Sequence, residues 1–298
     1  MLLQVLRICD VLGLDRRSHN SAPYIHGLIE AIKLVAADRE AYYGDPEFVS
    51  VPIDILLASD YAQMRANTID PARAFPAMPA AGTIGGQPAP DFHPKSLSLD
   101  SAPLDTSYIC VVDNRGNAFS ATPSDGVMRK SPIVPGTGLA LSARGIQSRL
   151  DPAHPAAVAP GKRPRLTPNP AIAVKAGEFV MPFGTPGGDL QVQAMSQVFL
   201  NIIAFGMDAQ TAVEQTRVYS YSFPDSFAPH AYYPGVLKVE SGLPEKTINE
   251  LVRLGHDVKP WPQDEWSRTG VCVAIDDHRR GIKLGAADSR RMSYALGT

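Results

Sequence analysis

The spacing of apolar residues along the chain predicts several amphipathic helices. The clearest covers residues 20–43, with Asn20 and Ser21 as capping residues and Pro23 in the first turn. Its apolar positions recur at helical spacing on one face: Ile25, Leu28, Ile29, Ile32 and Val35. The same pattern predicts helices from Leu2 to Gly13 and over residues 190–205, 208–215 and 245–254.

Between these helices, short apolar runs flank turn sequences and predict β-hairpins. The expected pairs are 108–112 with 117–122, 171–175 with 179–183, and 271–275 with 282–284. Paired strands with helices inserted between them indicate an α+β layered fold with an antiparallel sheet.

Residues 71–105 interrupt these patterns with frequent proline and glycine, which is typical of an extended, mobile tether. We take this tether as the main boundary of the chain. The predicted organisation is a first region, 1–105, that ends in the tether, and a second region, 106–298, that starts on a strand.

Composition narrows the class of protein. The 298 residues are 44% hydrophobic and 19% charged, with a formal net charge of −2, so nothing favours a nucleic-acid partner. No apolar stretch reaches the length of a membrane span, and the residues after Met1 do not form a signal peptide. Three widely spaced cysteines without a CxxC motif, and histidines without a metal-binding pattern, predict neither a disulfide framework nor a metal site. No cofactor is expected.

Thr106 is the first candidate for catalysis, because it opens a strand directly after the tether. Most threonines in strands are structural. If the bond between Asp105 and Thr106 were cut, however, Thr106 would hold both a hydroxyl nucleophile and a free α-amine. An α-amine has a pKa of about 7.7–8.0 and can act as a base at neutral pH, so one residue would supply nucleophile and base.

The second candidate is the glycine-rich segment 184–189, Gly-Thr-Pro-Gly-Gly-Asp, between a predicted strand and a predicted helix. Glycines let backbone N–H groups point at a ligand, and a helix start favours negative charge. The segment can therefore form an oxyanion hole. A tight turn containing a proline explains the same pattern equally well, and both interpretations stay open on the pattern alone.

Several segments combine, in order, into a more specific signal. They are His19–Ala22, Ala36–Arg39, Gly44–Pro46, Thr106–Asp113 with Gly116–Ala118, Pro135–Leu139, Pro160–Pro164, Gly184–Gly188, Phe205–Met207 and Gly285–Asp288. Together they resemble the gamma-glutamyltranspeptidase family over almost the whole chain, which corresponds to the C-terminal half of a family member.

The resemblance implies an N-terminal nucleophile hydrolase, an αββα sandwich that is made as a precursor and cuts itself between Asp105 and Thr106. Thr106 is then the nucleophile, and Gly187 and Gly188 supply the oxyanion-hole N–H groups. Ser124 falls where the family has a second threonine that bonds the nucleophile's amine. The sandwich is expected to be incomplete, because the N-terminal half of the family chain has no counterpart here.

Other positions depart from the family pattern. Arg144, Gln147 and Thr167 fall at substrate-binding positions, but Gln147 replaces an aspartate that binds the substrate's α-amino group, and Leu166-Thr167 replaces a pair of serines. Losing a carboxylate removes a charge-assisted bond to an ammonium group. The short loop 151–160 also departs from the transpeptidase pattern, and these differences resemble the acylase branch of the family.

The resemblance therefore implies a threonine amidohydrolase or acyltransferase acting on gamma-glutamyl amides, such as glutathione-like compounds, or on related acyl-amides. Two alternatives remain: a cephalosporin-acylase-like amidase, and a non-catalytic fragment or subunit that needs a large-subunit partner. The expected partners are a small-molecule substrate and either the missing large-subunit region or further copies of the chain. Family members are often periplasmic or extracellular, and the compartment of this chain stays open.

Overall fold

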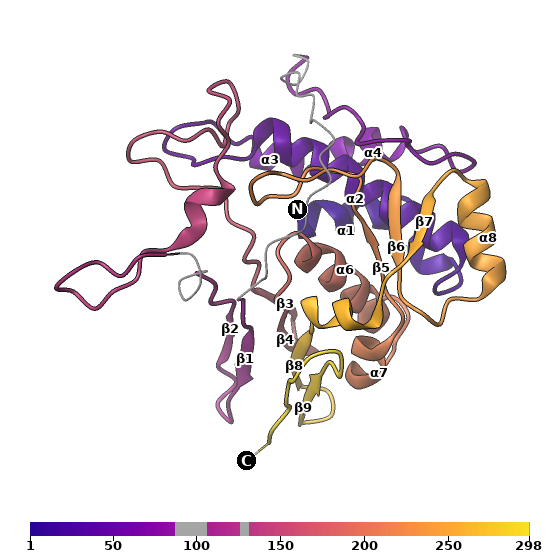
Figure 1. Cartoon of the computed structure of the whole chain (residues 1–298). Helices are drawn as coiled ribbons and strands as arrows, with labels where there is room; N and C mark the ends of the chain where they lie inside the picture. Colours follow the sequence, from indigo (N-terminus) through magenta and orange to yellow (C-terminus); the bar gives the residue numbers. More distant parts are fainter. Residues whose placement is uncertain (87–105, 126–130, 298) are drawn as a thin grey trace. The chain divides into compact units, whose positions relative to one another are not determined.

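The computed structural model describes residues 1–86, 106–125 and 131–297 (Figure 1). Most of the predicted tether and Asp105 lie outside these residues. The chain forms two packing units. Unit 1 comprises Met1–Ala102, Arg144–Leu166 and Val218–Pro260, and unit 2 comprises Pro103–Ala143, Thr167–Arg217 and Trp261–Thr298. The division predicted from the sequence, into regions 1–105 and 106–298, was placed at the expected self-cleavage site. It stays a prediction.

Unit 1 is built around α2, the long helix predicted from the sequence. Its elements are α1 (Leu2–Val11), α2 (Ala22–Tyr42), α3 (Ile53–Leu56), α4 (Ser59–Ala66), α8 (Glu245–Arg253) and the strands β5 (Val218–Ser220), β6 (Val236–Val239) and β7 (Asp257–Pro260). Helix α2 contacts α1, α8 and β5 and is buried along almost its whole length. Ser21 is the N-cap residue of α2 by position, although its side chain makes no capping hydrogen bond.

Part of the predicted tether is anchored to α2. Residues 71–86 form no helix or strand, but the Phe75 N–H donates to Glu30 Oε2 at 2.7 Å and the Gly82 N–H donates to Asp38 Oδ1 at 2.8 Å. Buried carboxylates on α2 therefore hold the backbone at these two residues, whereas the tether over 71–105 as a whole stays a prediction.

The three-stranded sheet of unit 1 was not predicted. Strand β6 lies between β5 and β7, and β6 pairs with β7 in parallel through the register Val236↔Asp257. The sequence predicted an antiparallel sheet and gave no sign of this parallel pair. These strands have three or four residues each, and the two parallel strands are joined through α8, so no hairpin turn marks them in the sequence.

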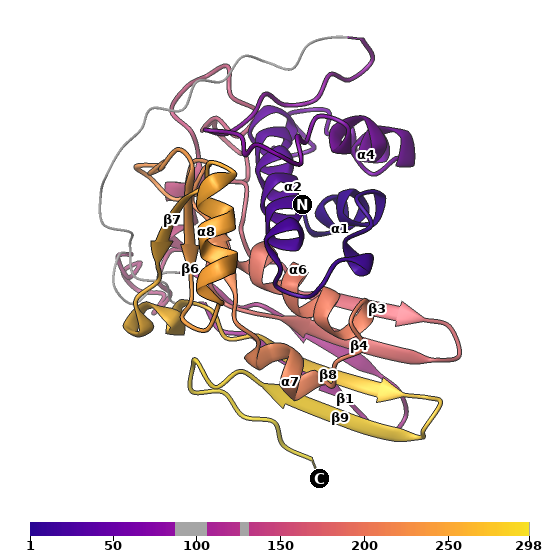
Figure 2. The same cartoon turned by 90° about the vertical axis from the view of Figure 1, so that its right-hand side faces the viewer.

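Unit 2 contains all three predicted hairpins. Its elements are β1 (Ile109–Val112), β2 (Ala118–Ala121), β3 (Ala171–Lys175), β4 (Phe179–Gly184), α6 (Leu190–Ile203), α7 (Ala209–Glu214), β8 (Cys272–Asp277) and β9 (Ile282–Ala287). Strands β3, β4, β8 and β9 form an antiparallel sheet in that order, and β1–β2 is a separate hairpin (Figure 2). Among the described residues, Leu14–Arg16, Ala143–Gln147 and Gln263–Arg268 form 3-10 helices.

Successive residues of β4 face the two opposite sides of this sheet. The Phe183 ring stacks against Phe199 of α6, with the ring centroids 5.7 Å apart. The next residue, Gly184, faces Tyr108 of the β1–β2 hairpin. Successive side chains of a strand point to opposite faces, so α6 covers one face of the sheet and the hairpin covers the other. Unit 2 is thus layered as helix, sheet and hairpin.

Across the described residues, no helix is long and apolar enough to cross a membrane.

Candidate active site

Thr106 lies at the entrance to β1 with its side chain buried. The residue is 2% exposed, and its Oγ1 lies 2.5 Å from Ser124 Oγ in a hydrogen bond that either hydroxyl could donate. The neighbouring Ser107 N–H donates to the Pro123 carbonyl at 3.0 Å. The segments before β1 and after β2 are therefore paired, and this pairing brings the two predicted hydroxyls together.

The glycine-rich segment connects β4 to α6 and has a backbone that requires glycine. Gly187 has φ of 133° and Gly188 has φ of 57°, both in the region that L side chains rarely adopt. A Cβ on Gly187 would also come within 3.0 Å of the Arg268 carbonyl oxygen. The Leu190 N–H bonds back to the Gly187 carbonyl at 3.0 Å, so the first turn of α6 closes directly on the loop.

The loop and the Thr106 segment approach each other closely at one point. A Cβ on Gly184 would lie 2.3 Å from Cε2 of Tyr108, so the Tyr108 ring rests on the bare backbone where the loop begins. The Tyr108 hydroxyl is held by Ser120 Oγ of β2 at 2.7 Å. The contact fixes the hairpin against β4, and with it the strand that Thr106 opens.

The three predicted substrate-binding residues are not brought together within one unit. Arg144 and Gln147 belong to unit 1, where they are 7% and 0% exposed in the 3-10 helix Ala143–Gln147. The Arg144 guanidinium lies over the Phe227 ring, 5.5 Å from its centroid. Thr167 is half-buried in unit 2. Thr106, Ser124 and the glycine loop all belong to unit 2.

Arg163, within the Pro160–Pro164 segment, and Arg165, just after it, form ion pairs in unit 1. Arg163 Nη2 lies 2.7 Å from Asp45, and Arg165 Nη2 lies 2.8 Å from Glu40. Burial alone would raise the pKa of Glu40, but Arg165, Arg39, His154 and Arg149 hold it well below its usual value. These sequence matches therefore mark structural ion pairs.

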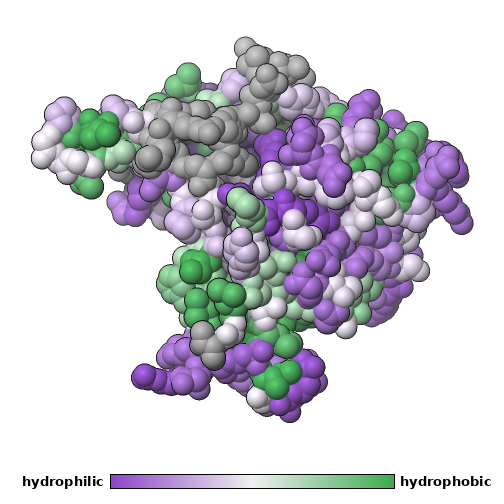
Figure 3. All heavy atoms as spheres, turned by 60° about the horizontal axis from the view of Figure 1, so that its bottom comes forward, coloured by the Kyte–Doolittle hydropathy of each residue, from purple (hydrophilic) through white to green (hydrophobic). Residues whose placement is uncertain are grey.

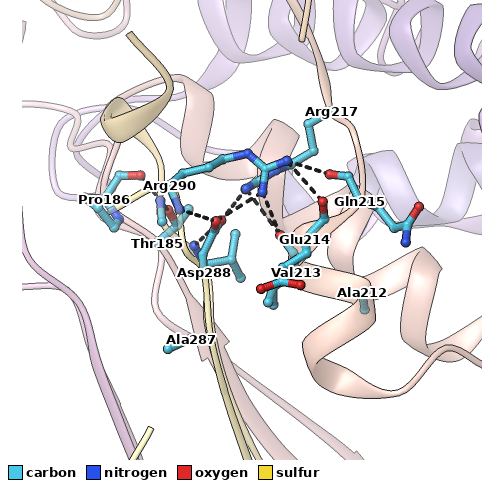
Figure 4. Close-up of polar contacts among 12 residues, drawn as sticks. Thr185, Pro186, Ala212, Val213, Glu214, Gln215, Arg217, Ala287, Asp288 and Arg290 are labelled. Atoms are coloured by element: carbon cyan, nitrogen blue, oxygen red, sulfur yellow. Dashed lines mark hydrogen bonds and ion pairs between the residues drawn. The ribbon is translucent and has the colours of Figure 1, made fainter. Parts of the chain in front are cut away.

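A buried ion-pair cluster follows β9 (Figure 4). The Asp288 carboxylate accepts hydrogen bonds from Arg217, from Arg290 at 3.1 Å, and from the Val271 N–H at 3.2 Å. Arg290 also donates to the carbonyls of Val213 and Gln215. The cluster ties the end of β9 to the segment after α7, and sequence reasoning missed it because its members lie far apart in the chain.

One cluster in unit 1 has the composition of a metal site. Ligand atoms of His26, Glu30 and His256 lie within 4.8 Å of one another and are buried. The sequence showed no metal-binding pattern among the histidines, since 230 positions separate His26 from His256. In the structure, His26 Nδ1 and His256 Nε2 are 3.0 Å apart. Lys33 Nζ lies 2.7 Å from Glu30 and already supplies positive charge. The cluster is accounted for as a buried hydrogen-bonded network.

Comparison with known proteins identifies the family of the chain. The gamma-glutamyltranspeptidase family model matches residues 1–298. The chain is 30% identical to the glutathione hydrolase proenzyme of Bacillus subtilis (strain 168) and 32% identical to the oxamate amidohydrolase proenzyme of Klebsiella pneumoniae. Each match covers 99% of this chain but 48% and 51% of the relative, so the chain spans about half the length of these curated relatives.

Solved structures give the same result. LmbA2991HD matches with a TM-score of 0.87 and 36% identity, covering 100% of this chain and 52% of that one. The cephalosporin acylase from Bacillus halodurans matches with a TM-score of 0.73 and 25% identity, covering 97% and 48%. The predicted α+β fold of the N-terminal nucleophile hydrolases is confirmed. The chain belongs to the gamma-glutamyltranspeptidase family of enzymes.

Proposed function

We propose that this chain is the nucleophile-bearing part of a threonine amidohydrolase or acyltransferase. The observation that supports this best is the 2.5 Å contact between Thr106 Oγ1 and Ser124 Oγ, at the start of the strand that packs on the glycine loop. An amide acyl group would pass to Thr106 and then to water or to an amine.

Self-cleavage would come first. Thr106 Oγ1 attacks the carbonyl carbon of Asp105, the bond from that carbon to the Thr106 nitrogen breaks, and an ester forms in its place. The Thr106 nitrogen takes up the hydroxyl proton and becomes a free α-amine. Water then hydrolyses the ester, which leaves a carboxylate on Asp105 and restores the Thr106 hydroxyl.

Turnover would use the groups that cleavage sets free. The α-amine of Thr106 accepts the proton of its own hydroxyl while Oγ1 attacks the substrate carbonyl, and the proton then passes to the leaving amine. The N–H groups of Gly187 and Gly188 would stabilise the oxyanion, since such donors act most strongly where charge develops in the transition state. Water or an acceptor amine attacks the resulting ester and regenerates Thr106.

The substrate class is proposed as gamma-glutamyl or related acyl-amides. The two curated relatives carry the names glutathione hydrolase and oxamate amidohydrolase, which differ in acyl group and share an amide bond. Gln147 in place of an aspartate favours an acyl group without an α-ammonium. Comparing rates on glutaryl amides with rates on gamma-glutamyl amides separates the two: faster release from glutaryl amides supports the acylase alternative.

A second candidate role is that of a subunit that acts with a partner polypeptide. Ile109, Val111 and Phe119 are 52%, 47% and 57% exposed on the outer face of the β1–β2 hairpin. Figure 3, in which the bottom of Figure 1 comes forward, shows apolar residues at the surface in the lower half of the view. Ile172 and Val174 of β3 are also exposed. Together with the half-length match, these faces favour a partner that corresponds to the unmatched half of the relatives.

Intact-mass analysis of the purified chain, with and without a co-expressed N-terminal half of a relative, tests the proposal. We expect two polypeptides, one beginning at Thr106, together with amidase activity. Thr106→Ala should abolish both, whereas Thr106→Ser keeps a hydroxyl and should retain slower cleavage. Cleavage only in the presence of the partner supports the subunit role. A single inert chain under both conditions overturns the enzymatic proposal.

A further inference from the structure

We propose that Arg291 is a positioning residue for Thr106: its guanidinium holds the nucleophile's main chain and places a positive charge beside its α-nitrogen. Arg291 Nη2 donates to the Thr106 carbonyl oxygen at 3.0 Å across 185 positions of sequence. The inference rests on the proposed role of Thr106. It assigns a function to a residue that belongs to neither the nucleophile strand nor the glycine loop.

The backbone next to Arg291 leaves room for this contact. A Cβ on Gly270 would come within 2.8 Å of the Arg291 Cβ and 3.3 Å of its Cδ, so the arginine stem lies directly against bare backbone. The Gly270 N–H in turn donates to Thr185 Oγ1 in the glycine-rich segment at 2.9 Å. One short stretch of chain therefore supports both Arg291 and the loop that follows β4.

The neighbouring arginine has a different role. Arg290 is engaged by Asp288 and by the carbonyls of Val213 and Gln215 (Figure 4). This anchors the turn after β9, from which Arg291 extends toward Thr106. Arg290 therefore fixes the fold of the turn, whereas Arg291 reaches the nucleophile's own backbone.

The charge of Arg291 has a chemical consequence. The carbonyl oxygen and the α-nitrogen of Thr106 are separated by only two carbon atoms, so the guanidinium lies roughly 6 Å from the amine that cleavage would release. A positive charge there disfavours the ammonium form and increases the fraction of amine that can act as a base. At that separation the expected effect is about half a unit to one unit of pH.

Other ionisable groups around Arg291 do not supply this charge. The Cys272 thiol on β8 lies near Arg291, and Tyr108 and Cys110 of the first hairpin lie near Cys272 in turn. Burial raises the pKa of all three side chains, so they stay neutral near pH 7. The Asp288 carboxylate is balanced by Arg217 and Arg290.

The first test does not depend on cleavage. In the Thr106→Ala background the residue-106 carbonyl is retained, and hydrogen exchange of the Ser107 amide reports how firmly this backbone is held. We expect Arg291→Met to accelerate that exchange at least tenfold and Arg291→Lys to accelerate it less. Arg280→Met, on the exposed β8–β9 turn, should leave it unchanged. Equal exchange in Arg291→Met and in its parent would overturn the inference, whatever the activity of the chain.

The second test uses the cleaved, active protein. Arg291→Met should move the acidic limb of the kcat/KM pH profile upward by about half a unit to one unit, because the α-amine becomes easier to protonate. Arg291→Lys keeps the charge and should keep the limb in place even if kcat falls. A purely structural role would lower kcat without moving the limb, and that result would overturn the charge effect. Failure of the parent to cleave would count against the proposed function, and the exchange experiment would still decide the role of Arg291.

Discussion

At the scale of single residues, the proposed cleavage and turnover both depend on the Thr106 hydroxyl, which contacts Ser124. The two oxygens are 2.5 Å apart, and Thr106 is almost fully buried. A buried hydroxyl that loses its partner is costly, and its orientation becomes free. Ser124 therefore fixes where the Thr106 oxygen points before a substrate arrives.

Ser124→Ala removes this partner, and we expect self-cleavage and turnover to slow by about 10- to 100-fold, since one lost hydrogen bond costs about 1–3 kcal/mol. Ser124→Thr keeps the hydroxyl and should retain most of the rate. The measurement is the rate of precursor conversion by intact mass, followed by kcat of the product. Unchanged rates in Ser124→Ala would show that the contact has no role in either step.

Sequence reasoning found residues whose signal is local and missed those whose signal is distant. Thr106 opens a strand and the glycine loop precedes a helix, so both could be proposed from their neighbours in the chain. Asp288 and Arg291 could not, because their partners Arg217 and Thr106 lie 71 and 185 positions away. Charged residues near a C-terminus give no sign of which distant backbone they contact.

At the scale of elements, the β1–β2 hairpin is held against the four-stranded sheet where Tyr108 meets Gly184. The backbone of β4 has no side chain at this position, and the aromatic ring occupies the space that a Cβ would need. The interface thus depends on a glycine whose role is close approach, in a strand where glycine is otherwise unfavourable.

Gly184→Ala places a methyl group 2.3 Å from Cε2 of the Tyr108 ring, and we expect a loss of about 1–3 kcal/mol in the free energy of unfolding through overpacking. Urea unfolding measures this loss. In a Tyr108→Ala background the same substitution should cost much less, because the ring is gone. Equal costs in the two backgrounds would mean that the hairpin does not rest on Gly184.

The buried histidine pair links α2 to the turn that follows α8. His26 Nε2 lies 2.9 Å from the Asp70 carbonyl and donates its proton there, so its Nδ1 is left to accept from His256 Nε2. Burial, with Lys33 and His26, lowers the pKa of His256 to about 3. His256 is therefore neutral in the folded protein at neutral pH.

This low pKa makes the stability of the fold depend on pH. The unfolded chain takes up a proton on His256 below about pH 6.5, whereas the folded chain does so only near pH 3, so stability falls as pH falls through this window. We expect a contribution of up to about 1.4 kcal/mol per pH unit. His256→Gln, whose amide can still donate to His26, should make the fall in urea midpoint between pH 6.5 and 4.5 shallower.

The exposed His278 provides the matched control for this experiment. His278→Gln should not make the fall in urea midpoint shallower, because that side chain is exposed on the β8–β9 turn and lies 3.7 Å from the Asp276 carboxylate. An identical slope in His256→Gln and in the parent would show that the buried pair does not govern acid stability.

The elements themselves were predictable to different degrees, for physical reasons. The three hairpins carry turn residues between short apolar runs, and the helices keep a 3.6-residue period, so both could be predicted from the sequence. The structure confirms them. Strands β5–β7 lack such turns. The segment 71–86 looks unstructured from its composition, yet buried carboxylates on α2 hold it, and composition does not reveal such contacts.

At the scale of the whole molecule, the β1–β2 hairpin carries three exposed apolar side chains on one face, Ile109, Val111 and Phe119. In an antiparallel pair, residues that face each other across the strands lie on the same side, and Val111 is opposite Phe119 in the register of β1 and β2. Ile109 shares that side, two positions along β1. The inner side, with Tyr108, packs on β4, so the hairpin has apolar residues on both faces, and in the part of the chain that the structure describes only the inner face is covered.

A hairpin that is apolar on both faces is typical of an internal layer, which supports the proposed partner polypeptide. The chain alone should therefore bind the hydrophobic dye ANS. Replacing Ile109, Val111 and Phe119 together by threonine should remove much of that signal. The matched control replaces Leu3, Ile53 and Val252, which are 62%, 56% and 51% exposed on three separate helices of unit 1, and should change the dye signal little.

Co-expression with the N-terminal half of a relative should reduce dye binding to the parent chain as much as the triple threonine substitution does. If instead both triple variants reduce the signal equally, the outer face of the hairpin is no more than ordinary surface, and the case for a covering partner would rest on the length of the relatives alone.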